Sequence, residues 1–311
     1  MKKMSVFCGL SFPAITCVFF VLVAFSPALG QKNSEWQEYR DISYSENMSG
    51  PVNDLQKLNL VVPAESDNMP LLIWIGGGAW SYGDRNIEMD LAHRFAESGI
   101  AVASVGHRLS PAVWHDATLK TGIQHPCHVE DVASAVAWLH KHAAEYGYDP
   151  DKFFIGGYSS GAHLAALISL DSSYLHKAGL STDIFKGVIP ISGAYDILSY
   201  YEGFLSGSSP ELAELHVKAV FGENTETFAQ ASPTSYLQHL SAPLLVMCDN
   251  SLYNYTRLLE DRIRETAFRD VRVMYAYNLS HGQLWRNLSN DPNSMYRNAI
   301  VDFIRALSLP G

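Results

Sequence analysis

Apolar positions along this chain fall into short, nearly continuous runs that alternate with longer segments of three-to-four periodicity. The short runs predict buried strands at residues 58–62, 71–75, 101–105, 153–156, 187–191, 244–248 and 272–277. The periodic segments predict helices at residues 86–97, 129–146, 161–170, 255–268 and 294–306. Strands that alternate with helices indicate an α/β fold, a mostly parallel central sheet with helices on both faces. Residues 198–238 have no strand pattern and predict a small helical insertion over the carboxyl ends of the sheet.

The first 30 residues have a different pattern. Lys2 and Lys3 precede an apolar stretch over residues 6–25, and small residues follow up to Gly30. This is the pattern of a secretory signal peptide cleaved after Gly30, and an uncleaved membrane anchor is the alternative. The sequence therefore predicts an exported protein, periplasmic or secreted, whose residues 31–311 form a single domain.

The amino-acid composition excludes some classes of function. The chain has 22 Lys and Arg and 32 Asp and Glu, which gives a formal net charge of −10. Nucleic-acid binding needs a basic face, and we do not expect one here. Without the signal peptide two cysteines remain, Cys127 and Cys248. An oxidising compartment would allow them to pair, but two cysteines make no disulfide framework, and we expect separate thiols.

A candidate nucleophile lies between the strand at 153–156 and the next helix. The intervening residues 157–161 read Gly-Tyr-Ser-Ser-Gly, a Gly-x-Ser-x-Gly pentapeptide in a strand–turn–helix context. Glycines are needed because the turn is tight, and the helix behind Ser159 directs its positive dipole end toward a developing anion. We expect Ser159 to attack a carbonyl group.

A second glycine-rich segment follows the strand at 71–75. Residues 76–80 read Gly-Gly-Gly-Ala-Trp. Small residues allow backbone N–H groups to approach a substrate oxygen closely, as an oxyanion hole requires. A plain flexible glycine turn is the alternative, and the large Trp80 directly after the small residues favours a shaped loop.

With these two motifs the chain resembles an α/β-hydrolase of the carboxylesterase type, and it is most similar to the hormone-sensitive-lipase-like and kynurenine-formamidase-like esterases. Residues 101–111, 131–169 and 192–196 also resemble segments of that family. The resemblance implies a sheet of about eight strands with a small helical cap, no cofactor, and oxyanion donors on the backbone of Gly78, Ala79 and Ser160. One departure is Gly76, which stands where the family has a histidine that braces the loop.

The remaining catalytic groups follow from position. His281 comes directly after the last strand and is expected to be the base, since a serine hydroxyl attacks only when a neighbouring base takes its proton. Asp249 ends the strand at 244–248 and is the expected acid, in the order nucleophile, acid, base. Counted without gaps, Asn250 or Ser251 would occupy the family's acid position, and a turn-capping role for Asp249 is the alternative.

The sequence also indicates roles for several other side chains. We expect Trp80, Tyr158 and Tyr195 to contact substrate, and Tyr82, Tyr200 and Tyr201 are further candidates for the pocket. His163 is expected to pack and form hydrogen bonds. Residues 125–128, His-Pro-Cys-His, offer three potential metal ligands, but a proline-kinked loop explains them as well, and no metal is predicted.

The predicted function is that of an exported serine hydrolase that cleaves small or medium carboxylic esters through an acyl-enzyme. The predicted partner is a small-molecule ester, with no nucleic acid and no integral membrane role beyond a possible N-terminal anchor. An arylformamidase-like amide hydrolase, an enzyme that removes feruloyl or acetyl groups from plant polysaccharide, and a non-catalytic binding protein on a hydrolase scaffold are the alternatives.

Overall fold

A computed structural model describes residues 31–32, 35–45, 53–64 and 68–309. The predicted signal peptide, residues 1–30, lies outside the described residues. Within the described ranges, no helix is both long enough and apolar enough to cross a membrane.

The described residues form a nine-stranded sheet with the order β1-β2-β3-β5-β4-β6-β7-β8-β9. Strands β1, β2, β3 and β5 pair antiparallel in succession, and the pairs from β5 through β4 to β9 are parallel. The bounds are β1 Gln31–Lys32, β2 Trp36–Ser43, β3 Lys57–Pro63, β4 Met69–Ile75, β5 Ala101–Val105, β6 Tyr148–Tyr158, β7 Phe185–Ile191, β8 Leu244–Asp249 and β9 Val271–Ala276. All seven predicted strands are present. Sequence patterning missed β1 and β2, and β2 is partly exposed along its whole length and carries no apolar run.

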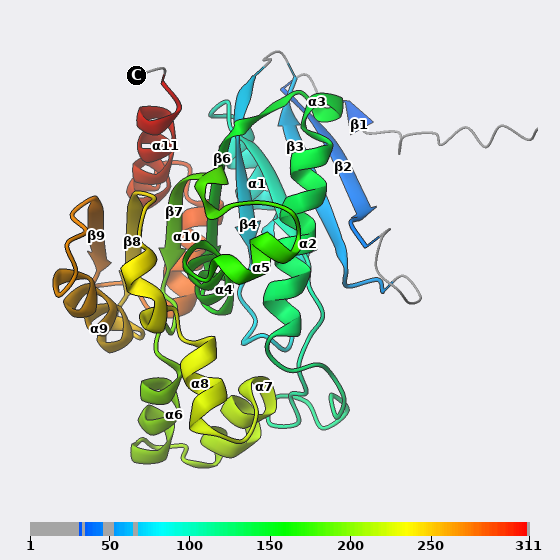
Figure 1. The fold of residues 1–311 in the computed structure, drawn as a ribbon. Coiled ribbons are helices and arrows are strands. Elements are labelled where there is room, and N and C mark those ends of the chain that lie inside the picture. Colours follow the sequence, from blue (N-terminus) through cyan, green and yellow to red (C-terminus); the bar gives the residue numbers. More distant parts are fainter. Residues whose placement is uncertain (1–30, 33–34, 46–52, 65–67, 310–311) are drawn as a thin grey trace, which may run out of the picture.

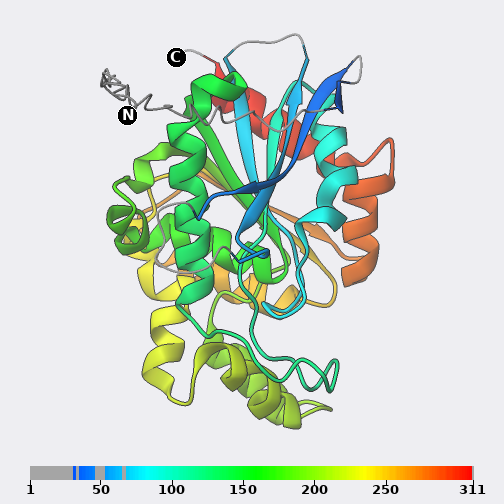
Figure 2. The same ribbon diagram turned by 90° about the vertical axis from the view of Figure 1, so that its right-hand side faces the viewer.

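Helices cover both faces of this sheet, as Figures 1 and 2 show. On one face, α1, α10 and α11 pack on Leu72, Trp74 and Phe154. On the other face, α2, α4 and α5 pack on Leu71, Ile73 and Phe153. The bounds are α1 Met89–Ala96, α2 Cys127–Lys141, α3 Ala143–Tyr146, α4 Ser160–Leu170, α5 Ser172–Lys177, α6 Ile197–Ser206, α7 Ala219–Phe221, α8 Thr225–Ala231, α9 Tyr253–Arg264, α10 His281–Asn290 and α11 Met295–Ser308. The predicted helix 129–146 is divided into α2 and α3, and α10 was not predicted.

The segment between β7 and β8 is helical and contains α6, α7 and α8. Figure 1 shows these helices together at one end of the sheet. We call residues 197–239 the cap. The cap is attached to the rest of the domain by backbone hydrogen bonds, since Thr234 N donates to Tyr195 O at 3.1 Å and His125 N donates to Val220 O at 2.8 Å.

Candidate active site

Ser159 occupies a strained turn between β6 and α4. Its φ is +56°, in the left-handed region that non-glycine residues rarely adopt. The neighbouring backbone explains the two glycines. A Cβ on Gly157 would stand 2.5 Å from the backbone of Gly161, and a Cβ on Gly161 would collide with the carbonyl oxygen of Ile75. The sequence Gly-x-Ser-x-Gly therefore folds into this turn because no larger residue fits at either end.

Asp249 and His281 are in direct contact. Asp249 Oδ2 accepts a hydrogen bond from His281 Nδ1 at 2.7 Å, and the carboxylate is buried at the end of β8. The other oxygen, Oδ1, accepts from the backbone N–H groups of Ser251 at 2.7 Å and Leu252 at 3.2 Å. Asp249 thus caps the turn with one oxygen and binds the imidazole with the other, which combines the two roles that the sequence left open.

The environment of Asp249 favours its charged form. Burial acts to raise the pKa of this carboxyl group, but hydrogen bonds with His281 and Ser192 outweigh burial and lower the pKa to about 2. The group is therefore ionised at neutral pH. A fixed carboxylate on Nδ1 makes Nε2 the ring nitrogen that is available as a base.

His281 is the first residue of α10, and Ser280 caps this helix together with Gln283. Ser159 and His281 line the same cavity, whose volume is about 460 Å³. Among the described residues no hydrogen bond joins Ser159 Oγ to His281, so the two side chains share the cavity without being bonded. Such contacts are often long in structures without substrate.

The loop after β4 presents its backbone to the same cavity. Positive φ angles of +135°, +50° and +58° at Gly78, Ala79 and Trp80 turn the chain sharply. Ser81 N and Tyr82 N donate to Gly78 O at 2.8 and 2.9 Å and close the turn. Gly78 and Ala79 line the cavity, and no described residue accepts a hydrogen bond from their N–H groups. Ser160, the first residue of α4, likewise has no acceptor for its N–H within the described ranges.

Two residues that we expected to contact substrate lie in the core instead. Trp80 is 3% exposed, and its Nε1 donates to His163 Nδ1 at 3.1 Å. Tyr195 is 0% exposed, and its hydroxyl accepts from Gly193 N at 3.2 Å. Neither borders the cavity, so both assignments are corrected: each aromatic ring fills space beneath the site. Tyr158 does border the cavity.

The cavity wall is mostly aromatic and aliphatic. Tyr82 and Tyr200 contribute to it, whereas Tyr201 lies away from it and donates to Glu214 at 2.9 Å. The lining residues are Gly77, Gly78, Ala79, Tyr82, Ile87, Glu88, Trp114, Tyr158, Ser159, Tyr200, Phe204, Leu212, His216, Leu252, His281, Gly282 and Trp285.

Glu88 is the charged residue of the cavity wall that the sequence did not predict. It is 1% exposed, and its Oε2 accepts hydrogen bonds from the indoles of Trp74 at 2.9 Å and Trp285 at 3.3 Å. A Cβ on Gly76 would stand 2.7 Å from Glu88 Oε1, so the carboxyl group fills the space that a side chain at position 76 would need. The only sequence signal was indirect: a glycine at position 76 leaves room that another residue must fill.

The other residues that the sequence analysis singled out, the possible metal ligands and His163, pack and form hydrogen bonds within the fold. His128 Nε2 lies 2.9 Å from Ser110 Oγ, and Cys127 and Cys248 are both free thiols. Within the described part of the chain no group of three His, Cys, Asp or Glu side chains is arranged to hold a metal ion. His163 Nε2 donates to Ala231 O at 2.7 Å, a packing and hydrogen-bonding role.

The chain is similar to several known proteins. Residues 58–251 match the model of the BD-FAE family. The chain is 33% identical over 183 residues to esterase LipQ of Mycobacterium tuberculosis, which covers 57% of this chain and 41% of LipQ. It is 29% identical over 212 residues to the probable carboxylic ester hydrolase LipM of the same organism, covering 67% of this chain and 46% of LipM. The chain thus spans less than half the length of either relative.

Solved structures share the fold. Esterase B from Lactobacillus rhamnosis (HN001) superposes with a TM-score of 0.71 at 22% identity, over 88% of this chain and 87% of that chain. A truncated carbohydrate esterase from gut microbiota gives 0.70 at 18% identity, over 90% and 99%. The chain has an α/β-hydrolase fold, as the sequence predicted. Within that class the chain belongs to the BD-FAE family.

Proposed function

We propose that this protein is a serine carboxylesterase that cleaves small or medium carboxylic esters through an acyl-enzyme. The observation that carries the proposal is the 2.7 Å contact between Asp249 and His281 beside a cavity that Ser159 also lines. Two esterase relatives and the shared family support the same chemistry.

In the proposed reaction His281 Nε2 takes the proton of Ser159 as its oxygen attacks the ester carbonyl. The N–H groups of Gly78, Ala79 and Ser160 bind the resulting oxyanion. The imidazolium then protonates the departing alcohol, which leaves an acyl group on Ser159. Water, deprotonated by the same imidazole, attacks this acyl group, and the acid product and free Ser159 are released.

The test is the variant Ser159→Ala against Ser173→Ala, a matched change at an exposed serine. We expect Ser159→Ala to lose at least about 10⁴-fold in kcat on p-nitrophenyl acetate, in line with other serine hydrolases. A fluorophosphonate should label the parent and Ser173→Ala but not Ser159→Ala. Equal hydrolysis by parent and Ser159→Ala would disprove the proposal. Absence of labelling in the parent would favour a non-catalytic scaffold, and faster cleavage of N-formyl amides than of esters would favour the formamidase.

We also propose that the protein is exported and loses residues 1–30. This proposal rests on the sequence pattern alone. N-terminal sequencing of the mature protein from an expressing bacterium tests it: a start at Gln31 supports cleavage after Gly30, and a start at residue 1 or 2 contradicts it.

A further inference from the structure

Glu88 lies in the cavity wall although the proposed reaction does not use it. It is the one acidic side chain among the described residues that line the cavity, and none of those lining residues is Lys or Arg. Nor does either histidine of the wall form an ion pair with this carboxyl group. His281 is paired with Asp249, and burial lowers the pKa of His216 to about 4, so that it is neutral at pH 7.

The carboxyl group of Glu88 is only half satisfied. Both indole N–H groups bond to Oε2, and Oε1 accepts no hydrogen bond from any residue that the structure describes. Burial raises the pKa of Glu88 because the charged form is poorly solvated. A buried carboxylate with an unused oxygen gains most from a cationic partner, since an opposite charge compensates the lost hydration.

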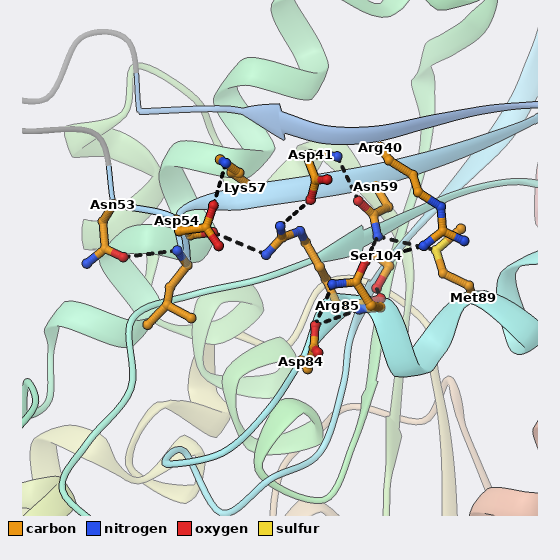
Figure 3. A network of polar contacts seen from close by, with 12 residues as sticks. Arg40, Asp41, Asn53, Asp54, Lys57, Asn59, Asp84, Arg85, Met89 and Ser104 are labelled. Carbon is orange, nitrogen blue, oxygen red and sulfur yellow. Dashed lines mark hydrogen bonds and ion pairs between the residues drawn. The ribbon is translucent and has the colours of Figure 1, made fainter. Parts of the chain in front are cut away.

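The position of Glu88 is fixed by a network around the 3₁₀ turn Arg85–Glu88. Ser104 Oγ donates to Arg85 O at 2.8 Å, Asp84 Oδ1 accepts from Asn86 N at 2.8 Å, and the guanidinium of Arg85 pairs with Asp41 (Figure 3). These bonds hold the turn from the strand side. The carboxyl group is therefore held at a fixed place in the wall and is not free to swing toward solvent.

That place is close to the reacting atoms. Glu88 Oε1 lies against Gly76, and the next residue, Gly77, lies so close to the nucleophile that a Cβ there would stand 3.2 Å from Ser159 Cβ. Through this path Oε1 is separated from Ser159 Cβ by no more than roughly 13 Å, given a spacing of about 3.8 Å between adjacent Cα atoms. A group two or three atoms beyond the ester oxygen of a bound substrate spans this distance.

We propose that Glu88 makes the cavity a binding site for a positively charged group, an ammonium carried by the alcohol part of the ester. Aromatic side chains along the same wall, among them Trp114, Tyr158 and Trp285, suit this ligand because ring faces attract cations. The proposal rests on the proposed esterase function and adds a substrate class to it. It predicts discrimination between esters of the same shape that differ only in charge.

Acetylcholine and 3,3-dimethylbutyl acetate are such a pair, since a carbon atom replaces the charged nitrogen. We expect the parent to show a kcat/KM for acetylcholine about tenfold higher than for the neutral ester at low ionic strength. Glu88→Gln should bring this ratio close to one, because the amide carries no charge, while its oxygen can still accept both indole N–H groups. Asp90→Asn, which removes an exposed charge two residues away, should keep the tenfold ratio.

A second variant covers the case in which Glu88→Gln does not fold. Ile87 is 52% exposed and lines the cavity, so Ile87→Lys adds an ammonium beside Glu88 and should abolish the preference, whereas Ile87→Met should keep it. A ratio near one in the parent, or a tenfold ratio that survives both Glu88→Gln and Ile87→Lys, overturns the cation site. Hydrolysis of the neutral ester in those experiments leaves the esterase proposal standing, and failure to hydrolyse any ester removes both.

Discussion

The cavity has two walls that are built on different principles. The sheet wall includes the backbone turns at the carboxyl ends of β4 and β6, where Ser159 and Ala79 have positive φ and a Cβ on Gly78 or Gly161 would collide with backbone atoms. The cap wall consists of side chains of the cap, namely Tyr200, Phe204, Leu212 and His216. Crowded backbone tolerates almost no change, whereas side chains on short helices can be exchanged. The sheet wall thus carries the groups of the proposed reaction, and the cap wall contributes to the shape of the space beside them.

The largest expected effect comes from a change to Asp249, the proposed acid beside the sheet wall. Asp249→Asn keeps the shape of the side chain but no longer stabilises the imidazolium, and the amide can favour the wrong tautomer of His281. We expect kcat on an aryl acetate to fall by roughly 10³- to 10⁴-fold at pH 7.5. An exposed counterpart, Asp261→Asn, should retain full activity. A loss of less than tenfold for Asp249→Asn would show that the contact at 2.7 Å is structural only.

The next effect tests the backbone crowding itself. Gly161→Ala places a methyl group against the carbonyl of Ile75, and backbone cannot move aside as a side chain can. We expect the free energy of unfolding to fall by about 3 kcal/mol, measured by urea denaturation. Gly282→Ala is the matched control in a helix, where the nearest atom is 3.4 Å away at the end of the flexible Arg286. Equal stability of the two variants would mean that the turn is less constrained than its geometry indicates.

The same contrast explains what the sequence could predict. Strands β3 to β9 carry apolar runs, and the constraint at Gly157 and Gly161 is local. The strands and the turn at Ser159 can therefore be predicted from short stretches of sequence. Whether a ring points into the cavity or beneath it is not a local property, and for this reason Trp80 and Tyr195 were misplaced. The carboxyl group of Glu88 was missed because one of its two indole partners, Trp285, is distant along the chain and comes close only after the sheet has formed.

The position of Asp249 could be predicted because it is the only carboxylate at the end of its strand. Its contact with His281 could not, because that distance depends on how β8, β9 and α10 pack side by side. Strand β2 could not be predicted for a related reason: a partly exposed strand with mixed residues has no pattern that separates it from a loop.

A third, smaller effect concerns the junction of the two walls. His163 lies on α4, accepts from Trp80 and donates to Ala231 of the cap. Burial lowers the pKa of His163 to about 3, so the folded protein keeps this ring neutral while the unfolded chain, with a pKa near 6.5, binds a proton. Stability from this group is present above pH 6.5 and is lost as the pH falls toward 3.

We therefore expect the free energy of unfolding of the parent to decrease between pH 6.5 and pH 4. His163→Leu should cost about 2 kcal/mol at pH 7.5, because the indole N–H of Trp80 loses its acceptor. The same variant should be less sensitive to acid, by up to about 1.4 kcal/mol per pH unit. The free energy of unfolding is measured by urea denaturation at each pH. If it depends on pH with the same slope in parent and variant, His163 is not a neutral link between cap and sheet.

The smallest expected effect shows whether Tyr158 positions the imidazole of His281 or binds substrate. The hydroxyl of Tyr158 donates to the backbone oxygen of His281 at 2.5 Å and lies 3.3 Å from Asp249 Oδ2, while its ring borders the cavity. Tyr158→Phe removes the hydroxyl and keeps the ring. If Tyr158 positions the imidazole, kcat should fall by about tenfold, roughly 1.4 kcal/mol, with KM nearly unchanged. If it instead binds substrate through its hydroxyl, KM should rise while kcat is retained. Steady-state kinetics on one aryl ester distinguishes these two roles. The geometry favours the fall in kcat, since the hydroxyl already donates to the backbone at the start of α10.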